Sequence, residues 1–267
     1  MPESLRRSRL YAIDLEGKNA FVFGVANQRS IAWHIASALD QAGARVALSY
    51  LNDRIRPGVE RLASGLSSGA PLIACDVSDD ASLENAFETA RAEMGGLDII
   101  VHSVAFANRE DLGGPFIDTP REGFRMALDI SAYSLVSVAR QAVPLMENGG
   151  SIITMTFQAS SRVFPGYNVM GTAKAALENE VRQLAWDLGR DNIRINAISA
   201  GPVDTLSSRV ISGYRDMKRA HSDRSPMGRN ITHEEVANTA LFLCSDMSTG
   251  ITGEVIHVDT GYHVMGI

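Results

Sequence analysis

Tyr167 and Lys174 are the two residues of this 267-residue chain whose types and spacing point most directly to chemistry. Seven residues make close to two turns of an α-helix, so both side chains would leave one face of a helix, about 10 Å apart along its axis. A phenol can donate its proton to a developing oxyanion, and a nearby ammonium favours the phenolate and can hold sugar hydroxyls. The same spacing also arises by chance, in which case the two residues are unrelated amphipathic side chains.

A second candidate site is the segment from Gly24 to Ala32, which directly follows an apolar run. A glycine permits a tight turn after a strand, and backbone amides at the start of a helix near Ser30 could approach a pyrophosphate. The segment departs from the G-x-G-x-x-G fingerprint, because Ala26 and Arg29 stand where glycines are expected. An ordinary turn between a strand and a helix is the alternative interpretation.

Two further positions concern the adenosine end of a dinucleotide. Asp76 follows an apolar run, and its carboxylate would lie near an adenine amino group if a dinucleotide crossed the sheet. A helix cap or a turn aspartate is the alternative. The segment from Tyr50 to Arg54 has neither an acid at the strand tip nor a tight basic cluster, so it leaves NAD and NADP both open.

The elements that would position these residues follow an alternating pattern from Asn19 to the C-terminus. Short β-branched apolar runs alternate with longer amphipathic stretches, which predicts an α/β fold: a single-domain, Rossmann-like, doubly wound parallel sheet of about seven strands. The expected strands are Ala20–Gly24, Val46–Tyr50, Leu72–Cys75, Ile99–Ser103, Ser151–Thr156, Arg194–Ile198 and Glu254–Val258. The expected helices are Ser30–Ala42, Pro57–Ser67, Ala81–Met94, Pro120–Glu147, Tyr167–Leu188 and His233–Ser245.

Helix end signals accompany three of these segments. Thr119 to Glu122 predicts a cap, a proline at the first helical position and a capping-box glutamate, and Thr232 to Glu235 predicts a second capping box. Gly43 is typical of a position just past a helix end. No repeat or linker interrupts the chain, so residues 1–267 are expected to form one domain.

The segment from about 203 to 230 breaks the alternation. It is long, polar and only weakly helical, and it follows the sixth strand, at the edge where open α/β sheets bind ligands. We therefore expect a substrate-binding lid, with a solvated surface excursion as the alternative.

Composition excludes several classes of protein. A net charge of −6 argues against a nucleic-acid-binding surface, and 45% apolar with 21% charged residues excludes disordered and disulfide-scaffold chains. Cys75 and Cys244 lie in apolar stretches without a C-x-x-C pair or a metal-ligand spacing, so we expect buried thiols and no metal site. No signal peptide or membrane-spanning run is seen, which predicts a cytoplasmic protein without membrane contact.

Taken in order, several motifs resemble those of the bacterial enoyl-[acyl-carrier-protein] reductases of the short-chain dehydrogenase/reductase superfamily. The resemblance runs from about residue 14 to the end of the chain. The matching segments are Gly24 to Ala32, Asp76-Val77, His102 to Ala107, Asp129 to Ser131, Tyr167 to Lys174, Ile198 to Thr205 and Gly250 to His263.

The resemblance implies a role for individual residues. Catalysis would fall to Tyr167, facing the thioester carbonyl, and Lys174, holding the nicotinamide ribose. The implied cofactor contacts are Gly24, Ser30, Ile31, Leu51, Asp76, Val77, Ser103, Val104, Ala105, Lys174, Val203 and Thr205. The implied substrate contacts are Ala107, Phe157, Tyr167, Met170, Leu206 and Ile211.

The resemblance also implies a reaction and its partners: reduction of the trans-2 double bond of an enoyl thioester in fatty acid biosynthesis, with acyl carrier protein as carrier and a homotetramer as the assembly. NADH is the expected cofactor, with NADP(H) as the alternative. Leu51 stands where an arginine would grip a 2′-phosphate, and Asp53 would repel that phosphate.

Phe157 and Asp204 are the main departures from the family pattern, beside Ala105, where relatives often have glycine, and Leu51, which replaces a polar residue. Many relatives carry a second tyrosine ten residues before the catalytic one, whereas this chain has Phe157, which cannot donate a hydrogen bond. Relatives often have a basic residue at the position of Asp204, and an acid there would weaken pyrophosphate binding unless it points away.

Two alternative functions remain at this level. A carbonyl reductase or alcohol dehydrogenase of the same superfamily would want Asn-Asn-Ala-Gly after the fourth strand and a serine thirteen residues before Tyr167, where this chain has Thr154. A dinucleotide-binding protein with reduced catalysis is the other alternative, suggested by Phe157 and Asp204.

Overall fold

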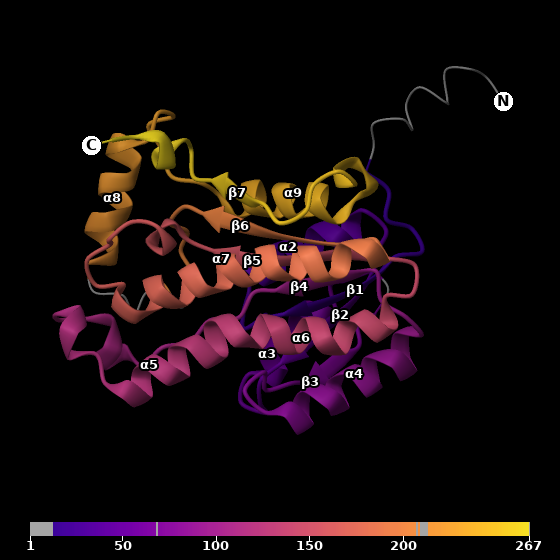
Figure 1. The fold of residues 1–267 in the computed structure, drawn as a ribbon. Coiled ribbons are helices and arrows are strands. Elements are labelled where there is room, and N and C mark those ends of the chain that lie inside the picture. Colours follow the sequence, from indigo (N-terminus) through magenta and orange to yellow (C-terminus); the bar gives the residue numbers. More distant parts are fainter. Residues whose placement is uncertain (1–12, 68, 207, 209–212, 267) are drawn as a thin grey trace, which may run out of the picture.

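The computed structural model describes residues 13–67, 69–206, 208 and 213–266. Its centre is a seven-stranded parallel sheet in the order β3-β2-β1-β4-β5-β6-β7 (Figure 1). The order runs outward in both directions from β1 and β4, so the connections pass over both faces and leave a crevice at the carboxyl ends of these two strands. The strands are β1 Asn19–Phe23, β2 Arg45–Tyr50, β3 Leu72–Ala74, β4 Ile99–His102, β5 Gly150–Thr156, β6 Ile193–Ala200 and β7 Val255–Val258.

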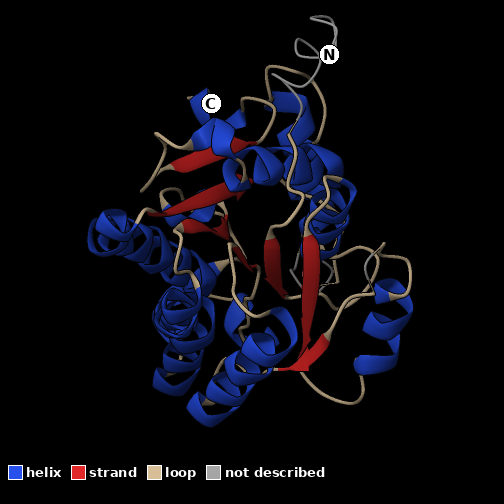
Figure 2. Cartoon of the chain, turned by 90° about the vertical axis from the view of Figure 1, so that its right-hand side faces the viewer, coloured by secondary structure: helices blue, strands red, loops and turns tan. Residues whose placement is uncertain are grey.

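Helices cover both faces of this sheet, as Figure 2 shows. They are α2 Ile31–Gln41, α3 Arg56–Ala63, α4 Asp80–Met94, α5 Arg121–Leu128, α6 Ser134–Ala142, α7 Asn168–Leu188, α8 Tyr214–Arg224 and α9 His233–Cys244. One apolar core joins the sheet to α2, α3 and α9, and a second joins the other face to α4, α6 and α7. Along β1, Ala20 and Val22 belong to the first core while Phe21 and Phe23 belong to the second. Burial on both faces explains why the strand sequences are apolar throughout.

The expected strands are all confirmed, each with bounds shifted by two residues at most. The expected helices other than Pro120–Glu147 are confirmed as well, although α3 ends at Ala63, four residues early. Gly43 follows the end of α2 with a φ of +99°, a conformation that glycine adopts without strain. The capping box of α9 is present, because Thr232 Oγ1 accepts from the Glu235 amide at 3.2 Å and the Glu235 carboxylate accepts from the Thr232 amide at 2.8 Å.

The expectation of one helix over Pro120–Glu147 is wrong in detail. A π-helical turn, Asp129–Tyr133, separates α5 from α6, and a 3₁₀ turn, Val143–Leu145, follows. The predicted cap is wrong too, because the Thr119 hydroxyl donates to the Phe116 carbonyl at 2.7 Å and Pro120 takes the cap position instead. Thr119 thus closes the short turn before the helix, and this local bond competes with capping.

The segment expected to be weakly helical contains the eleven-residue helix α8. Its inward-facing residues are Tyr214, Met217, Lys218 and His221, at the i, i+3, i+4, i+7 spacing of one helix face. Two of these four are polar, so the sequence does not display the apolar stripe by which a helix is recognised. His221 nevertheless is 4% exposed, stacked on Tyr262 with ring centroids 4.6 Å apart.

Candidate active site

The predicted site residues lie at the carboxyl edge of the sheet, around the crevice between β1 and β4. Gly24 ends β1 with a φ of +97°, and a Cβ atom there would collide with the backbone carbonyl of Ser103 after β4. The turn after β1 therefore lies directly against the segment that begins at Ser103. Only glycine allows this close approach of two backbone segments.

Ser30 closes the loop after β1 rather than capping α2 with its side chain. Its Oγ accepts hydrogen bonds from the amides of Ala26 and Asn27, at 3.0 and 3.1 Å. The amides of Ile31 and Ala32 open α2 and have no intrahelical acceptor, so they remain available at the positive end of the helix dipole. The predicted phosphate-binding turn thus has the required geometry, with its free amides at Ile31 and Ala32 rather than earlier in the loop.

Asp76 occupies the turn after β3. Its Oδ1 accepts from the amide and the hydroxyl of Ser78, at 3.0 and 2.6 Å, so the turn interpretation of this residue is realised. Asp79, not Asp76, caps α4. The second carboxylate oxygen of Asp76 has no hydrogen-bond partner among the described residues, so it could still meet an adenine amino group.

Leu51 is the first residue after β2 and is 53% exposed. The position at the tip of this strand is therefore held by an apolar side chain and not by an acid or a base. Nearby, the Arg56 guanidinium lies over the Tyr50 ring, 5.6 Å from its centroid. The Arg56 guanidinium is thus held by an aromatic face at the end of β2.

Tyr167 stands at the N-cap of α7, against an aromatic group. Its ring is 4.9 Å from that of Phe157, which lies 4.7 Å from Phe164. Burial, and secondarily the phenol of Tyr214, raises the pKa of the Tyr167 hydroxyl well above its usual range. Lys174, which was expected to favour the phenolate, is not among the groups that shift this pKa, and the hydroxyl keeps its proton at neutral pH.

Lys174 is buried, with 7% of its surface exposed. Its Nζ donates to the Met155 carbonyl at 2.9 Å, which attaches α7 to the end of β5. Burial lowers the pKa of this amine to about 8, against the opposing attraction of Glu178 and Glu180. One proton of the ammonium is thus engaged, and the others are available to hydroxyl oxygens in the crevice.

Beneath the crevice, His102 is completely buried within β4. Its Nε2 lies 2.8 Å from the hydroxyl of Ser134, which itself donates to the Ile130 carbonyl at 2.7 Å. Nε2 must therefore carry the imidazole proton, so that Nδ1 accepts from the Thr154 hydroxyl at 2.9 Å. Burial, and then the nearby Lys174, lowers the pKa of His102 to about 3. Sequence reasoning did not find this network, because its members lie up to 52 residues apart.

The predicted substrate contacts divide into separate groups. Ala107, Met170 and Tyr167 belong to one small apolar cluster with Leu112. Leu206 is 52% exposed and lines a different cavity, of about 530 Å³, beside Asn27 to Arg29. It therefore lies by the loop after β1 and not by the aromatic group. Ile211 lies outside the described residues.

The segment after β6 is connected to α8 by two polar contacts. The Tyr214 hydroxyl donates to the Val203 carbonyl at 2.6 Å, and Lys218 Nζ lies 2.7 Å from a carboxylate oxygen of Asp204. Asp204 thus points toward α8, where Lys218 neutralises its charge. In this orientation the carboxylate does not oppose the binding of a pyrophosphate. The Thr205 side chain accepts from the amide of Ser208 at 3.1 Å. Tyr214 is a residue whose polar role the sequence did not reveal.

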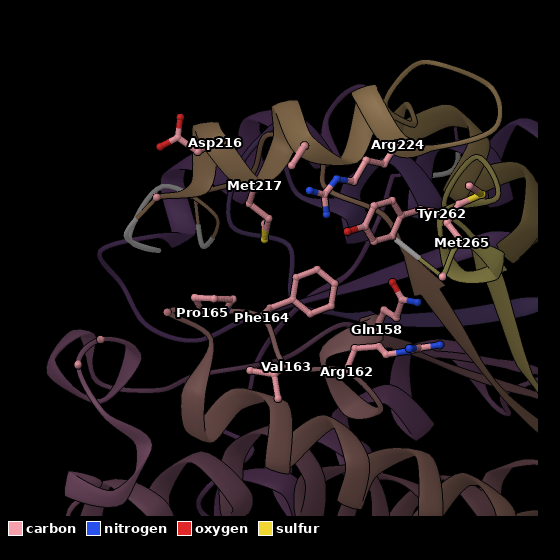
Figure 3. A pocket seen from close by; sticks show the side chains of 16 residues that line it. Gln158, Arg162, Val163, Phe164, Pro165, Asp216, Met217, Arg224, Tyr262 and Met265 are labelled. Carbon is pink, nitrogen blue, oxygen red and sulfur yellow. The ribbon is translucent and has the colours of Figure 1, made fainter.

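A cavity of about 820 Å³ opens between α8, the segment before Tyr167 and the C-terminal residues (Figure 3). Phe164 and Met217 face one another across it, and Tyr262 and Gln158 lie at one end. Because Phe164 contacts Phe157 and Phe157 contacts Tyr167, the cavity adjoins the aromatic group. An elongated molecule could lie here with one end near Tyr167.

These features fit a dinucleotide. Gly24 lets the turn after β1 lie against the end of β4, the amides at the start of α2 suit a pyrophosphate, and Lys174 offers donors to ribose hydroxyls. No group of three His, Cys, Asp or Glu side chains among the described residues is placed to hold a metal ion. Within the same part of the chain, no helix combines the length and apolar character that a bilayer span requires.

Comparisons with known proteins agree with this geometry. Residues 24–263 match the family model described as "Enoyl-(Acyl carrier protein) reductase". The chain is 49% identical over 253 residues to the NADH-dependent enoyl-[acyl-carrier-protein] reductase FabI of Bacillus cereus, covering 94% of this chain and 99% of that protein. It is 46% identical to the FabI of Staphylococcus aureus, whose name specifies NADPH, over 95% of this chain and 99% of that protein.

Solved structures give the same result for the fold. The Bacillus cereus enzyme in complex with NADP+ and indole naphthyridinone superimposes with a TM-score of 0.93 at 48% identity, covering 95% of this chain and all of that one. The enoyl reductase (NADH) of Aquifex aeolicus gives a TM-score of 0.92 at 48% identity, with 95% and 99% coverage. The predicted Rossmann-like fold is therefore confirmed.

Proposed function

The chain belongs to the enoyl-(acyl carrier protein) reductase family, and on that premise we propose that it reduces the trans-2 double bond of an enoyl thioester in fatty acid biosynthesis, using NADH. The relatives are named for NADH in some species and for NADPH in others, so NAD(H) is the cofactor and NADP(H) remains compatible. The observation that carries the proposal is the Tyr167 phenol against the aromatic group beside the large cavity, two turns of α7 before the buried amine of Lys174.

When bound, a reduced nicotinamide supplies a hydride to the β-carbon of the enoyl group. The work of the chain's own residues is to orient the thioester and to stabilise charge. Negative charge grows on the thioester oxygen as the double bond is reduced, and the Tyr167 hydroxyl would donate a hydrogen bond to it. A donor of this kind in a water-poor site contributes about 3–4 kcal/mol to the barrier reduction. Because burial raises the pKa of Tyr167, the hydrogen-bonding proton is retained across the neutral range.

Other residues would hold the nucleotide. We assign the pyrophosphate to Gly24, Ser30 and Ile31, with Thr205 on the opposite side, and the adenine to Asp76 and Val77. The central part of the nucleotide would pass over Ser103, Val104 and Ala105. Lys174 would bind the nicotinamide ribose, and Val203 the nicotinamide amide. Leu51 would lie beside the adenosine ribose.

The carbonyl reductase alternative loses support from the position of Thr154. In that alternative a hydroxyl thirteen residues before Tyr167 would face the substrate. Here the Thr154 hydroxyl is buried and donates to His102 Nδ1, so it has no free proton for a substrate oxygen.

The test is loss of NADH absorbance with trans-2-octenoyl thioesters of coenzyme A or acyl carrier protein. Turnover with a saturated product supports the proposal. Measurable NADH binding without turnover on any enoyl thioester would contradict it and leave the dinucleotide-binding alternative.

Acyl carrier protein is the proposed macromolecular partner, and α8 is its proposed contact. Carrier proteins are acidic, and α8 exposes basic side chains. Lys218 pairs with Asp204 and Arg219 with Asp223, whereas Arg215 forms no ion pair with a described residue. Opposite charge of this kind raises association rates more than affinity.

We further infer one catalytic domain and a homotetramer in the cytoplasm. The long helix α7 lies beside α5 and α6 on one face (Figure 1), and Trp186 on α7 is 78% exposed, which favours a subunit contact there. Cys75 and Cys244 are both free and buried, as is usual in a reducing compartment. Light scattering of the purified chain tests the assembly.

A further inference from the structure

The large cavity beside the aromatic group carries two arginine side chains that the proposed chemistry does not use. Arg162 enters from the segment before Tyr167 and Arg224 from the last turn of α8, on the opposite wall (Figure 3). The remaining lining near Phe164, Pro165 and Met217 is apolar. The cavity is thus amphipathic, with an apolar middle and cationic groups from both sides.

The described residues do not neutralise this charge. Neither guanidinium forms an ion pair or a side-chain hydrogen bond with a described residue, in contrast to Arg229, which binds Glu235 through two nitrogens at 2.6 and 3.0 Å. The one acid of the cavity lining, Asp216, points outward from the cavity in Figure 3. Both arginines thus line the cavity: Arg224 points into it beside Tyr262, and Arg162 runs beneath Gln158 toward its C-terminal side.

We propose that Arg162 and Arg224 bind the phosphate group of the phosphopantetheine arm that carries the acyl thioester. This inference rests on the proposed function, since it concerns the substrate of the same site. Arginine binds phosphate oxygens through paired N–H donors, and it keeps its charge at all relevant pH values. The arm is a long, mostly neutral chain with one strongly anionic end. The cavity matches it, because its apolar middle adjoins the aromatic group and its charged groups Arg162 and Arg224 are cationic.

The chain of ring contacts gives the direction of the bound arm. Tyr167 contacts Phe157 and Phe157 contacts Phe164, which lines the cavity. A thioester at the Tyr167 hydroxyl would therefore extend its arm past Phe164, and the phosphate would come to the arginines beyond it. The site serves any phosphopantetheine thioester, whether the arm is attached to coenzyme A or to a carrier protein.

The experiment compares two substrates that differ only in this group: trans-2-octenoyl-pantetheine and its 4′-phosphate. For the unmodified protein we expect kcat/KM to be at least about tenfold higher with the phosphate, mostly through a lower KM, because charge-assisted hydrogen bonds of this kind are worth about 1.5–3 kcal/mol. The ratio should fall as salt is raised, since both arginines are solvent-exposed.

The double variant Arg162→Ala/Arg224→Ala should bring this ratio down to about two or less. A matched control is Arg91→Ala/Arg190→Ala, which removes the same charge. Arg91 lies in the last turn of α4. Arg190 lies just beyond the C-terminal end of α7, whose 21 residues span about 30 Å, whereas the cavity adjoins the N-terminal end of that helix. The control should keep the ratio of the unmodified protein.

Melting temperature and NADH fluorescence titration verify that the double variant is folded, and Arg162→Gln/Arg224→Gln replaces it if the alanine variant is not. Equal kcat/KM for the two substrates in the unmodified protein, or an unchanged ratio in the folded double variant, overturns the phosphate site while leaving the reductase function intact. If neither thioester is reduced despite NADH binding, the proposed function itself fails and the phosphate site falls with it.

Discussion

The imidazole Nδ1 of His102 lies 2.9 Å from the hydroxyl oxygen of Thr154, on the adjacent strand. With Ser134 on the other nitrogen, the ring is held in one tautomer in a fully buried position below the crevice. This contact withdraws the Thr154 hydroxyl from the substrate side, and it connects β4, β5 and α6 in a single polar network. The network therefore holds β5 in place at Thr154, next to Met155, whose carbonyl accepts the hydrogen bond from Lys174.

Acid should weaken the fold through His102. Its pKa is lowered from 6.5 to about 3, so between these values the unfolded chain binds a proton that the folded chain does not. Stability from the neutral ring is therefore complete above pH 6.5 and is lost as the pH falls toward 3, with a slope of up to about 1.4 kcal/mol per pH unit. Urea unfolding at several pH values should show this slope in the unmodified protein and a smaller one in His102→Gln. Equal slopes in the two proteins would contradict the assignment of a buried neutral ring.

Tyr167→Phe should lower kcat for enoyl thioesters by about 10²–10³-fold, because it removes the hydrogen bond to the thioester oxygen. The phenyl ring keeps the contact with Phe157, so the melting temperature and the NADH affinity should change little. Steady-state kinetics and NADH titration check the two parts. A variant with more than a third of the original kcat would show that another group stabilises the charge.

Lys174→Met should weaken NADH binding by about tenfold or more, because it removes the donors assigned to the ribose and leaves the Met155 carbonyl without its partner. Fluorescence titration of NADH measures the effect. Lys18→Met is the control, since it removes an equal charge from a surface pair with Asp98 at 3.1 Å and should leave the NADH affinity unchanged.

Gly24→Ala should reduce the free energy of unfolding by about 2–5 kcal/mol, because it combines a positive φ with a collision against the Ser103 carbonyl. Chemical denaturation measures the loss. Gly189→Ala is the matched control: its φ is −60° and an added Cβ meets no atom within 4 Å, so stability should be equal or slightly higher. Similar stabilities for the two variants would mean that the turn after β1 does not touch Ser103.

Leu51→Arg/Asp53→Asn should shift cofactor preference toward NADPH by about tenfold or more, because an exposed arginine at the tip of β2 would meet a 2′-phosphate while the repelling acid is gone. Leu51 is 53% exposed, so the fold should tolerate the change. The ratio of kcat/KM for NADPH and NADH is the measurement. An unchanged ratio would place the adenosine ribose elsewhere.

The sequence predicted the sheet well because burial on both faces leaves strands such as Phe21 to Phe23 with no polar position, a pattern that depends little on the rest of the fold. The placement of Tyr167 at the start of a helix and Lys174 two turns further on was also predictable, since their spacing is local. Gly24 was recognised for the same reason: its role depends on a turn between adjacent elements.

The remaining features depend on contacts between distant segments. The raised pKa of Tyr167 results from burial under Phe157 and beside Tyr214, which no local pattern encodes. The helix α8 was missed because lysine and histidine occupy half of its inner face. The predicted cap at Thr119 failed because a neighbouring carbonyl competes for its hydroxyl.

The two hydrogen bonds between α8 and the segment after β6 have a consequence for protein engineering. Tyr214 and Lys218 attach this helix to Val203 and Asp204, beside the expected nicotinamide position. A chimera that exchanges α8 to accept a different acyl chain would therefore also disturb coenzyme affinity. Transplanted helices should retain both side chains, or bring their own residues 203 and 204 with them.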